Sequence, residues 1–307
     1  MRPSATRLTL GVATAILGAV MLSWAPAASA TFPGENGKIL FRKTGRQAGF
    51  WTVAPRSGEL ERIAKSRDGG DAQWGPNGKT FVYAEGGDIY LSRHGKKERV
   101  TSTPEPELAP SLSGPGGERI AYWTYDSEQP DNGGAQIWVM SRDGTNRRQI
   151  TESNPDLIDQ NPSFSPDGSL IAFDRRTSAP SGVDDRGVCV MRADGSDVNC
   201  LPEWVGSSFT PSFAPDGRSL TFVRDVNSGQ VVVTFNLKST RFREISPAYL
   251  HAENPAFSPN GKRIAYTGYG AKGQAIYVRD LRSERRTRLT PPRFDAHINP
   301  TLSWAAR

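Results

Sequence analysis

The stretch NPSFSPDGSLIAF, residues 161–173, decides the fold of this chain. It predicts a short strand, a tight turn and a second strand that runs back beside the first. Within the turn, Pro166 presets φ, Asp167 accepts a hydrogen bond from nearby backbone, and Gly168 supplies a positive φ. The run from Leu170 to Phe173 is apolar throughout, which is typical of a strand buried on both faces.

The same hairpin recurs with a period of about forty to fifty residues, a range that includes propeller blades. Two more β-rich segments follow each copy, with Gly, Pro, Asn and Asp at the breaks. Four strands per repeat favour a propeller blade over a helical repeat. The further copies are DAQWGPNGKTFVYAE from Asp71, APSLSGPGGERIAYW from Ala109, TPSFAPDGRSLTFVR from Thr210 and NPAFSPNGKRIAYTG from Asn254.

The two ends of the chain supply the parts of one more repeat. NPTLSW from Asn299 matches the first strand of a blade and stops where the turn should begin, and PGENGKILF from Pro33 begins with that turn. One blade shared between the N- and C-termini would close the ring and remove two open sheet edges. We therefore predict an all-β fold, a six-bladed β-propeller of four-stranded antiparallel blades, as a single domain over residues 31–307.

The repeat pattern P-x-F-S-P-D-G-x-x-I-A-F resembles that of TolB-type, WD-repeat-like β-propellers of exported bacterial proteins. The resemblance covers essentially the whole chain after residue 30, in five to six copies. It implies the propeller fold, whereas propellers of this superfamily include scaffolds, binding modules and enzymes. No segment resembles the separate N-terminal domain of TolB itself.

Residues 1–30 are typical of a secretory signal peptide. Arg2 and Arg7 are followed by an apolar run from Leu8 to about Trp24 and by a small-x-small end at Ala30. We expect cleavage after Ala30 and an exported protein, with an uncleaved membrane anchor as the alternative. About 277 residues then remain, which suits six blades of about 46 residues each.

The charge of the chain is only mildly basic. Without Arg2 and Arg7 the formal net charge falls from +6 to +4. The cluster RSERRTR, from Arg282 to Arg288, lies on a hairpin predicted at the rim, where charge discourages strand pairing. We expect no nucleic-acid partner, because an exported protein meets little nucleic acid. We also expect a monomer.

Cys189 and Cys200 are the only cysteines, and both belong to one blade. They lie at equal sequence distance from the Asp194-Gly195 turn, so a two-residue hairpin places them opposite each other. In an oxidising compartment this arrangement predicts a cross-strand disulfide, and two buried free thiols are the alternative. Neither a CxxC motif nor a zinc-binding pattern is present.

Three motifs resemble ligand sites but coincide with turns of the repeat. The segment from Gly75 to Thr80 ends like a phosphate-binding loop yet leads into a strand, and residues 268–273 match GxGxxG between two antiparallel strands. The acids of the Ser-Pro-Asp-Gly turns could suggest calcium. However, Asp167 and Asp216 are replaced by Asn77 and Asn260 in other repeats, which favours turn-shaping side chains. We expect no cofactor.

One face of the predicted disc varies from repeat to repeat. It carries the hairpins between second and third strands and the connections into each first strand, and we call it the loop face. Because functional groups gather on loops of rigid scaffolds, we expect ligand binding there and at the channel mouth. The residue just before the proline of each first strand, or its equivalent, should lie in a ring around the channel mouth. This ring comprises Asp71, Ala109, Asn161, Thr210, Asn254 and Asn299, and turn capping is the alternative role for its polar members. The candidate residues are Asp71, Asp159, Asn161, Trp204, Thr210, Tyr249, His251, Asn254, Phe294, Asp295, His297 and Asn299.

These observations lead to two functional hypotheses. The first is an exported, non-catalytic binding or scaffold protein whose ligand is a protein, a peptide or a cell-envelope component. The second is a carbohydrate-active enzyme, lyase- or hydrolase-like, that uses His251, His297 and nearby carboxylates. The spacing of these two histidines resembles that of metal-dependent polysaccharide lyases, in which clustered His binds metal. No catalytic residue and no metal ligand is assigned.

Overall fold

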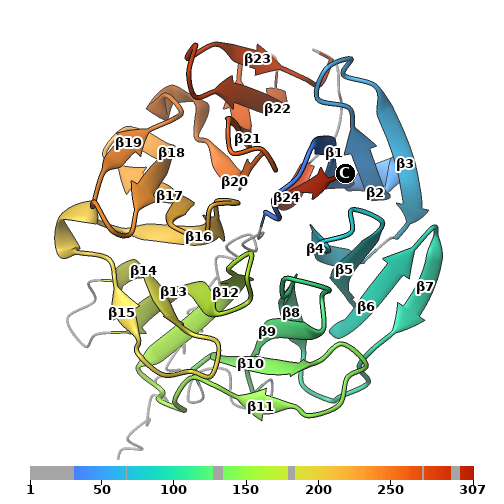
Figure 1. Cartoon of the computed structure of the whole chain (residues 1–307), viewed down its shortest axis with the longest axis vertical. Helices are drawn as coiled ribbons and strands as arrows, with labels where there is room; N and C mark the ends of the chain where they lie inside the picture. Colours follow the sequence, from blue (N-terminus) through green and yellow to red (C-terminus); the bar gives the residue numbers. More distant parts are fainter. Residues whose placement is uncertain (1–30, 67, 127–133, 179–183, 272, 292–297) are drawn as a thin grey trace, which may run out of the picture.

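The computed structural model describes residues 31–66, 68–126, 134–178, 184–271, 273–291 and 298–307. Its strands form six four-stranded antiparallel sheets arranged around a centre, which confirms the predicted propeller (Figure 1). We number these sheets as blades in chain order. The predicted signal peptide, residues 1–30, lies outside the described residues.

Blade 1 combines strands from both ends of the chain. Its order is β24-β1-β2-β3, and β24 pairs antiparallel with β1, for example Ser303 with Leu40. This is the strand membership predicted from the two incomplete repeats, and closure of the ring by this blade stays a prediction. The strands are β24 (Ile298–Ala306), β1 (Asn36–Lys43), β2 (Gly49–Val53) and β3 (Leu60–Lys65), with η1 (Gly45–Gln47) between β1 and β2.

The other five blades each use four consecutive strands. Blade 2 comprises β4 (Gly69–Trp74), β5 (Thr80–Glu85), β6 (Asp88–Arg93) and β7 (Lys96–Arg99). Blade 3 comprises β8 (Glu107–Leu112), β9 (Arg119–Thr124), β10 (Gln136–Ser141) and β11 (Arg148–Gln149). Blade 4 comprises β12 (Leu157–Phe164), β13 (Leu170–Ser178), β14 (Asp184–Arg192) and β15 (Asn199–Cys200).

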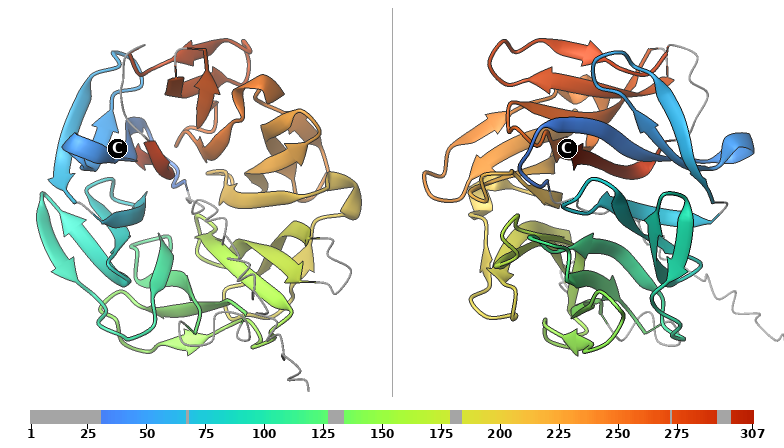
Figure 2. Two further views of the ribbon diagram at one scale, coloured as in Figure 1. Left: turned by 180° about the vertical axis from the view of Figure 1, so that it is seen from behind. Right: turned by 45° about the vertical axis from the view of Figure 1, so that its right-hand side comes forward.

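Blade 5 comprises β16 (Ser208–Phe213), β17 (Ser219–Val226), β18 (Gly229–Asn236) and β19 (Phe242–Glu244). Blade 6 comprises β20 (Glu253–Phe257), β21 (Arg263–Gly270), β22 (Gly273–Asp280) and β23 (Arg286–Arg288). Two short 3-10 helices, η2 (Glu203–Val205) and η3 (Ala248–Leu250), lie in the connections that lead into blades 5 and 6. Figure 2 shows the same disc from behind and in an oblique view.

The turn chemistry of the repeat is the one that the sequence predicts. In the turn of blade 4, Gly168 has φ +72° and its N–H donates to the Ser165 carbonyl at 2.9 Å. The Asp167 carboxylate accepts hydrogen bonds from the Ser165 hydroxyl at 2.5 Å and from the Ser169 N–H at 3.0 Å, which lowers its pKa. The side-chain oxygens of Asn77, Asp216 and Asn260 accept from the backbone in the same way.

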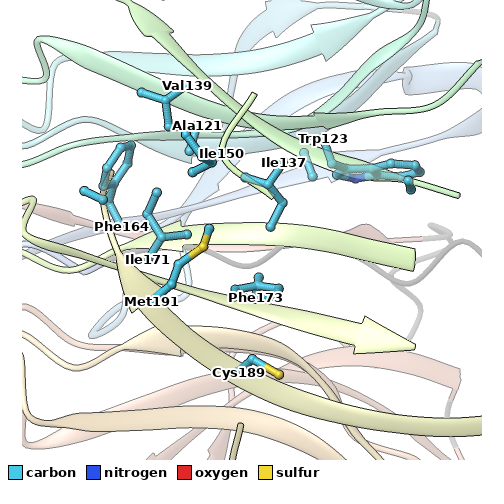
Figure 3. Close-up of a cluster of buried hydrophobic side chains, with 13 residues drawn as sticks. Ala121, Trp123, Ile137, Val139, Ile150, Phe164, Ile171, Phe173, Cys189 and Met191 are labelled. Atoms are coloured by element: carbon cyan, nitrogen blue, oxygen red, sulfur yellow. The ribbon is translucent and has the colours of Figure 1, made fainter. Parts of the chain in front are cut away.

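The core lies between neighbouring blades. Between blades 3 and 4, Trp123 and Ile137 face Phe164 and Phe173, with Cys189 at the edge of the cluster (Figure 3). Each blade thus buries its two apolar faces against its neighbours, as the continuous apolar runs of the second strands predict. Cys189 pairs with Cys200 across β14 and β15 and forms the predicted disulfide.

Hydrogen bonds also join the inner strands of successive blades. Near its end, each of these inner strands carries a large buried apolar residue, such as Trp74, Leu112 or Phe164. Its backbone N–H donates to a side-chain oxygen of the preceding blade, which belongs to the residue just before that blade's own large apolar residue. Ser303 thus accepts from Trp74 at 2.9 Å, Gln73 from Leu112 at 2.7 Å, and Ser111 from Phe164 at 3.1 Å. These contacts hold four neighbouring inner strands in register, because each satisfies a buried N–H outside its own sheet.

Candidate functional site

The inner strands share an unusual backbone feature near the loop face. In β8, β12, β16 and β20 the pairing with the second strand shifts register at the residue before proline. These residues have left-handed φ values of +50° to +57°, at Ala109, Asn161, Thr210 and Asn254. Since residues before proline favour extended backbone, and a β-branched residue rarely has positive φ, each bulge stores strain.

Two members of the predicted ring converge on one carboxylate. Asp174, on β13, is buried and accepts hydrogen bonds from Asn161 Nδ2 at 3.0 Å and from the Thr210 backbone N–H at 3.2 Å. Arg186 Nη2 lies 2.8 Å from the same carboxylate, and its guanidinium stacks over the ring of Phe209 at 4.3 Å. Asp174 therefore joins the inner strands of blades 4 and 5 at the level of the bulges.

Asp159, another predicted site residue, forms a second buried ion pair in blade 4. Its two carboxylate oxygens accept bidentate hydrogen bonds from Arg175 Nε and Nη2, at 2.7 and 2.8 Å. Only 1% of the Asp159 side chain is exposed, against 22% for Arg175. The hydrogen bonds to Asp159 raise the pKa of Arg175. This geometry gives the pair a structural role, since both acceptor oxygens of Asp159 are engaged.

Other members of the ring bind their local neighbours. Asn254 Nδ2 donates to Thr267 Oγ1 at 2.9 Å, and the Asp71 carboxylate accepts from Thr301 Oγ1 at 2.7 Å. Asn161 Oδ1, Asn254 Oδ1 and Thr210 Oγ1 are buried without a hydrogen-bond partner among the described residues. The ring is thus held by side-chain contacts within blade 6 and between blades 1 and 2, and it also keeps unsatisfied polar atoms. Turn capping, the alternative role of these residues, stays a prediction.

The structure places Trp204 and Tyr249 beside outer strands, at matching positions in the middle of η2 and η3. Trp204 is 57% exposed, and its ring centroid lies 6.0 Å from those of Phe235 and Phe242 in blade 5. Tyr249 is 65% exposed, and its hydroxyl accepts from Arg286 Nη2 at 2.9 Å in blade 6.

His251 ends η3 and is exposed, in a left-handed conformation with φ +42°. Within the described ranges no three His, Cys, Asp or Glu side chains are grouped closely enough to bind a metal ion. Phe294, Asp295 and His297 lie outside the described residues. Asn299 is placed in β24 opposite Arg42.

Sequence reasoning missed Asp174, Arg175 and Arg186. The first two directly follow the apolar run Leu170–Phe173 on a strand that continues to Ser178. A charged pair that interrupts a buried strand is a signal that could have identified them, because buried charges need partners.

Comparison with known protein families and solved structures agrees with the propeller fold. Residues 176–304 match the family model of the TolB beta propeller domain. This part of the chain, from the end of β13 through blades 5 and 6 to β24, is therefore similar to a TolB beta propeller domain. The predicted resemblance is therefore confirmed.

Solved structures of TolB proteins share the fold of this propeller. TolB from Acinetobacter baumannii superposes with a TM-score of 0.69 at 20% identity, over 90% of this chain and 68% of that one. A putative TolB from Agrobacterium tumefaciens gives 0.63 at 17% identity, over 83% and 88%. An oligogalacturonate lyase in complex with manganese gives 0.57 at 12% identity, over 86% of each chain. At these identities the similarity shows the fold alone.

In the part of the chain that the structure describes, we find no apolar helix of membrane-spanning length.

Proposed function

We propose that this TolB-type propeller is an exported binding or scaffold protein that engages a protein, peptide or cell-envelope ligand through its loop face. Export rests on the N-terminal segment predicted as a signal peptide, and the Cys189–Cys200 disulfide is consistent with an oxidising compartment.

The observation that carries the proposal is the position of the exposed aromatic side chains. Four large hydrophobic side chains are exposed among the described residues: Val198, Trp204, Tyr249 and Tyr269. Tyr269 lies at the end of β21, beside the hairpin to β22, and Trp204 and Tyr249 lie in connections into inner strands. Three of the four thus belong to the loop face of blades 5 and 6.

These residues have the chemistry of protein-binding surfaces. Trp, Tyr and Arg are enriched at positions that dominate binding energy, and Arg286 stacks over Tyr249 with its guanidinium 5.8 Å from the ring centroid. The left-handed backbone at His251, at the end of η3, fixes the direction of this connection. A rigid blade beneath the aromatic residues lowers the entropy cost of binding.

A peptide-display selection against the immobilised protein, residues 31–307, tests the proposal. We expect enriched peptides to lose about 30-fold in affinity with Tyr249→Ala or Tyr269→Ala alone and up to about 1,000-fold when the two are combined, because hot-spot truncations cost about 2 kcal/mol each. Val198→Ala is the matched control, since Val198 is exposed on the hairpin between β14 and β15, on the opposite face. Selected peptides that bind the double variant as tightly as wild type would contradict the proposal.

The alternative, a carbohydrate-active enzyme, has two supports: the shared fold of the oligogalacturonate lyase and the exposed imidazole of His251. It depends on a metal held by His251 together with His297 or a carboxylate. A manganese titration separates the two functions. Stoichiometric Mn²⁺ binding that is lost in His251→Ala would favour the enzyme, and its absence in wild type would remove the metal-dependent form of this alternative.

A further inference from the structure

A pocket of about 670 Å³ opens on blade 3, apart from the loop-face aromatic residues of blades 5 and 6. Its wall is one face of the blade 3 sheet, as the strand register shows. Glu107 on β8, Thr124 on β9 and Gln136 on β10 are direct cross-strand neighbours. Tyr122 and Trp138 form the next row on that face, since side chains two residues apart along a strand share a face. Residues 103–105 of the connection from blade 2 close one side.

The second row of side chains, Tyr122 and Trp138, borders the hydrophobic core between blades 2 and 3. Tyr122 is buried in a cluster with Val82 and Leu91 of blade 2, and Trp138 packs against this cluster while remaining partly exposed. The aromatic part of the pocket is therefore fixed by core packing before any ligand binds, and such preorganisation favours affinity.

Glu107 is a buried carboxylate at this wall. Its side chain is 3% exposed, and Oε1 lies 3.2 Å from Arg147 Nη1. Oε2 has no hydrogen-bond partner among the described residues. Burial raises the pKa of Glu107, although the Thr101 hydroxyl, the Arg147 guanidinium and the Thr103 hydroxyl act in the opposite direction. A buried carboxylate oxygen without a partner in the protein is open to a donor from water or from a ligand.

Two further polar atoms of the same wall are also unsatisfied. Trp138 Nε1, a donor, and Thr124 Oγ1 are buried without a hydrogen-bond partner in the described chain. The carboxylates of Glu105, Glu107 and Asp126 line the pocket, against the single guanidinium of Arg147. The pocket thus combines an excess of negative charge, aromatic rings and one unused N–H donor.

We propose that this pocket binds an organic cation with N–H donors, a guanidinium or primary ammonium, next to a hydrogen-bond acceptor of the same ligand. The cation lies against Trp138 and donates to Glu107, because aromatic faces and a carboxylate both attract positive charge. The ligand's acceptor receives the Trp138 N–H. An arginine or lysine residue of a peptide has both parts, whereas a free amine has only the first.

Isothermal titration calorimetry with two probes distinguishes these sources. Nα-acetyl-arginine amide represents a peptide residue, and n-butylguanidinium, which carries the same single charge, represents a free guanidinium without the carbonyl groups. We expect the acetylated amide to bind with a Kd of about 1 mM or tighter, the range that its size allows, and n-butylguanidinium to bind more weakly. Equal affinities would assign the pocket to a free amine. Binding of neither probe at concentrations far above that range would overturn the proposal.

Two isosteric variants locate the binding. Glu107→Gln is expected to weaken both probes at least tenfold, and Glu118→Gln, an exposed residue in the turn at the other end of the same hairpin, should leave both unchanged. Trp138→Phe keeps an aromatic ring but removes the N–H, so it should weaken only the acetylated amide. Circular dichroism and melting curves verify that each variant is folded. Unchanged affinity in a folded Glu107→Gln protein would also overturn the proposal.

Discussion

The substitution Asp174→Asn tests whether the buried carboxylate organises the inner strands of blades 4 and 5. The carboxylate accepts from Asn161 Nδ2, from the Thr210 N–H and from Arg186, whose side chain is only 13% exposed. An amide in its place turns an NH₂ group toward at least one of these donors and leaves Arg186 without its counter-charge. Because removal of one partner of a buried ion pair costs about 3–5 kcal/mol, and Arg186 keeps some access to water, we expect a loss of about 3 kcal/mol.

The assay is chemical denaturation with a parallel melting curve. For a domain of this size, about 3 kcal/mol corresponds to a decrease in Tm of roughly 6–12 °C. Asp197→Asn is the matched control, because Asp197 pairs with Arg192 at 2.5 Å while both side chains are more than 60% exposed. Exposed pairs contribute about 0–1 kcal/mol, so the control should barely change. A loss below about 1 kcal/mol for Asp174→Asn, no larger than the control, would refute the reasoning.

Three further predictions concern the ring, the disulfide and the pH dependence. Ser111→Ala removes the acceptor of the Phe164 N–H and should cost about 1–3 kcal/mol, with faster hydrogen exchange at that amide. Reduction of Cys189–Cys200, separated by 11 residues, should lower the free energy of unfolding by about 2–3 kcal/mol, measured by denaturation with and without reductant. Burial raises the pKa of Glu107 in the folded state, so its contribution to stability is lost as pH rises from the ordinary carboxyl pKa toward the raised one. The stability of wild type relative to Glu107→Gln should therefore fall across that window, and a constant difference would contradict the assignment.

Much of the fold follows from local chemistry that repeats. Each hairpin carries its own turn signal and a continuous apolar strand, so the strands could be predicted copy by copy. The N-terminal turn and the C-terminal strand complement each other in the sequence itself, which predicted the membership of blade 1. The disulfide followed from the symmetry of Cys189 and Cys200 about one turn.

The site was less predictable, because its geometry depends on contacts between blades. A residue before proline favours extended backbone, so the left-handed bulges at Asn161 and Thr210 oppose the local preference and exist only within the assembled ring. Asp174 binds residues 13 and 36 positions away, which no local pattern reveals. Trp204 lies in a connection whose 3-10 turn directs its ring to the outer strands of blade 5.

Site-specific photo-crosslinking in the native host is a direct test of ligand binding at the loop face. A photoreactive phenylalanine analogue replaces Tyr249 in one strain and Val198, on the opposite face, in another. Ligand binding at the loop face predicts a discrete crosslinked product from position 249, reduced by a second substitution at Tyr269, and none from position 198. A product from position 198 with none from position 249 would place the ligand on the opposite face.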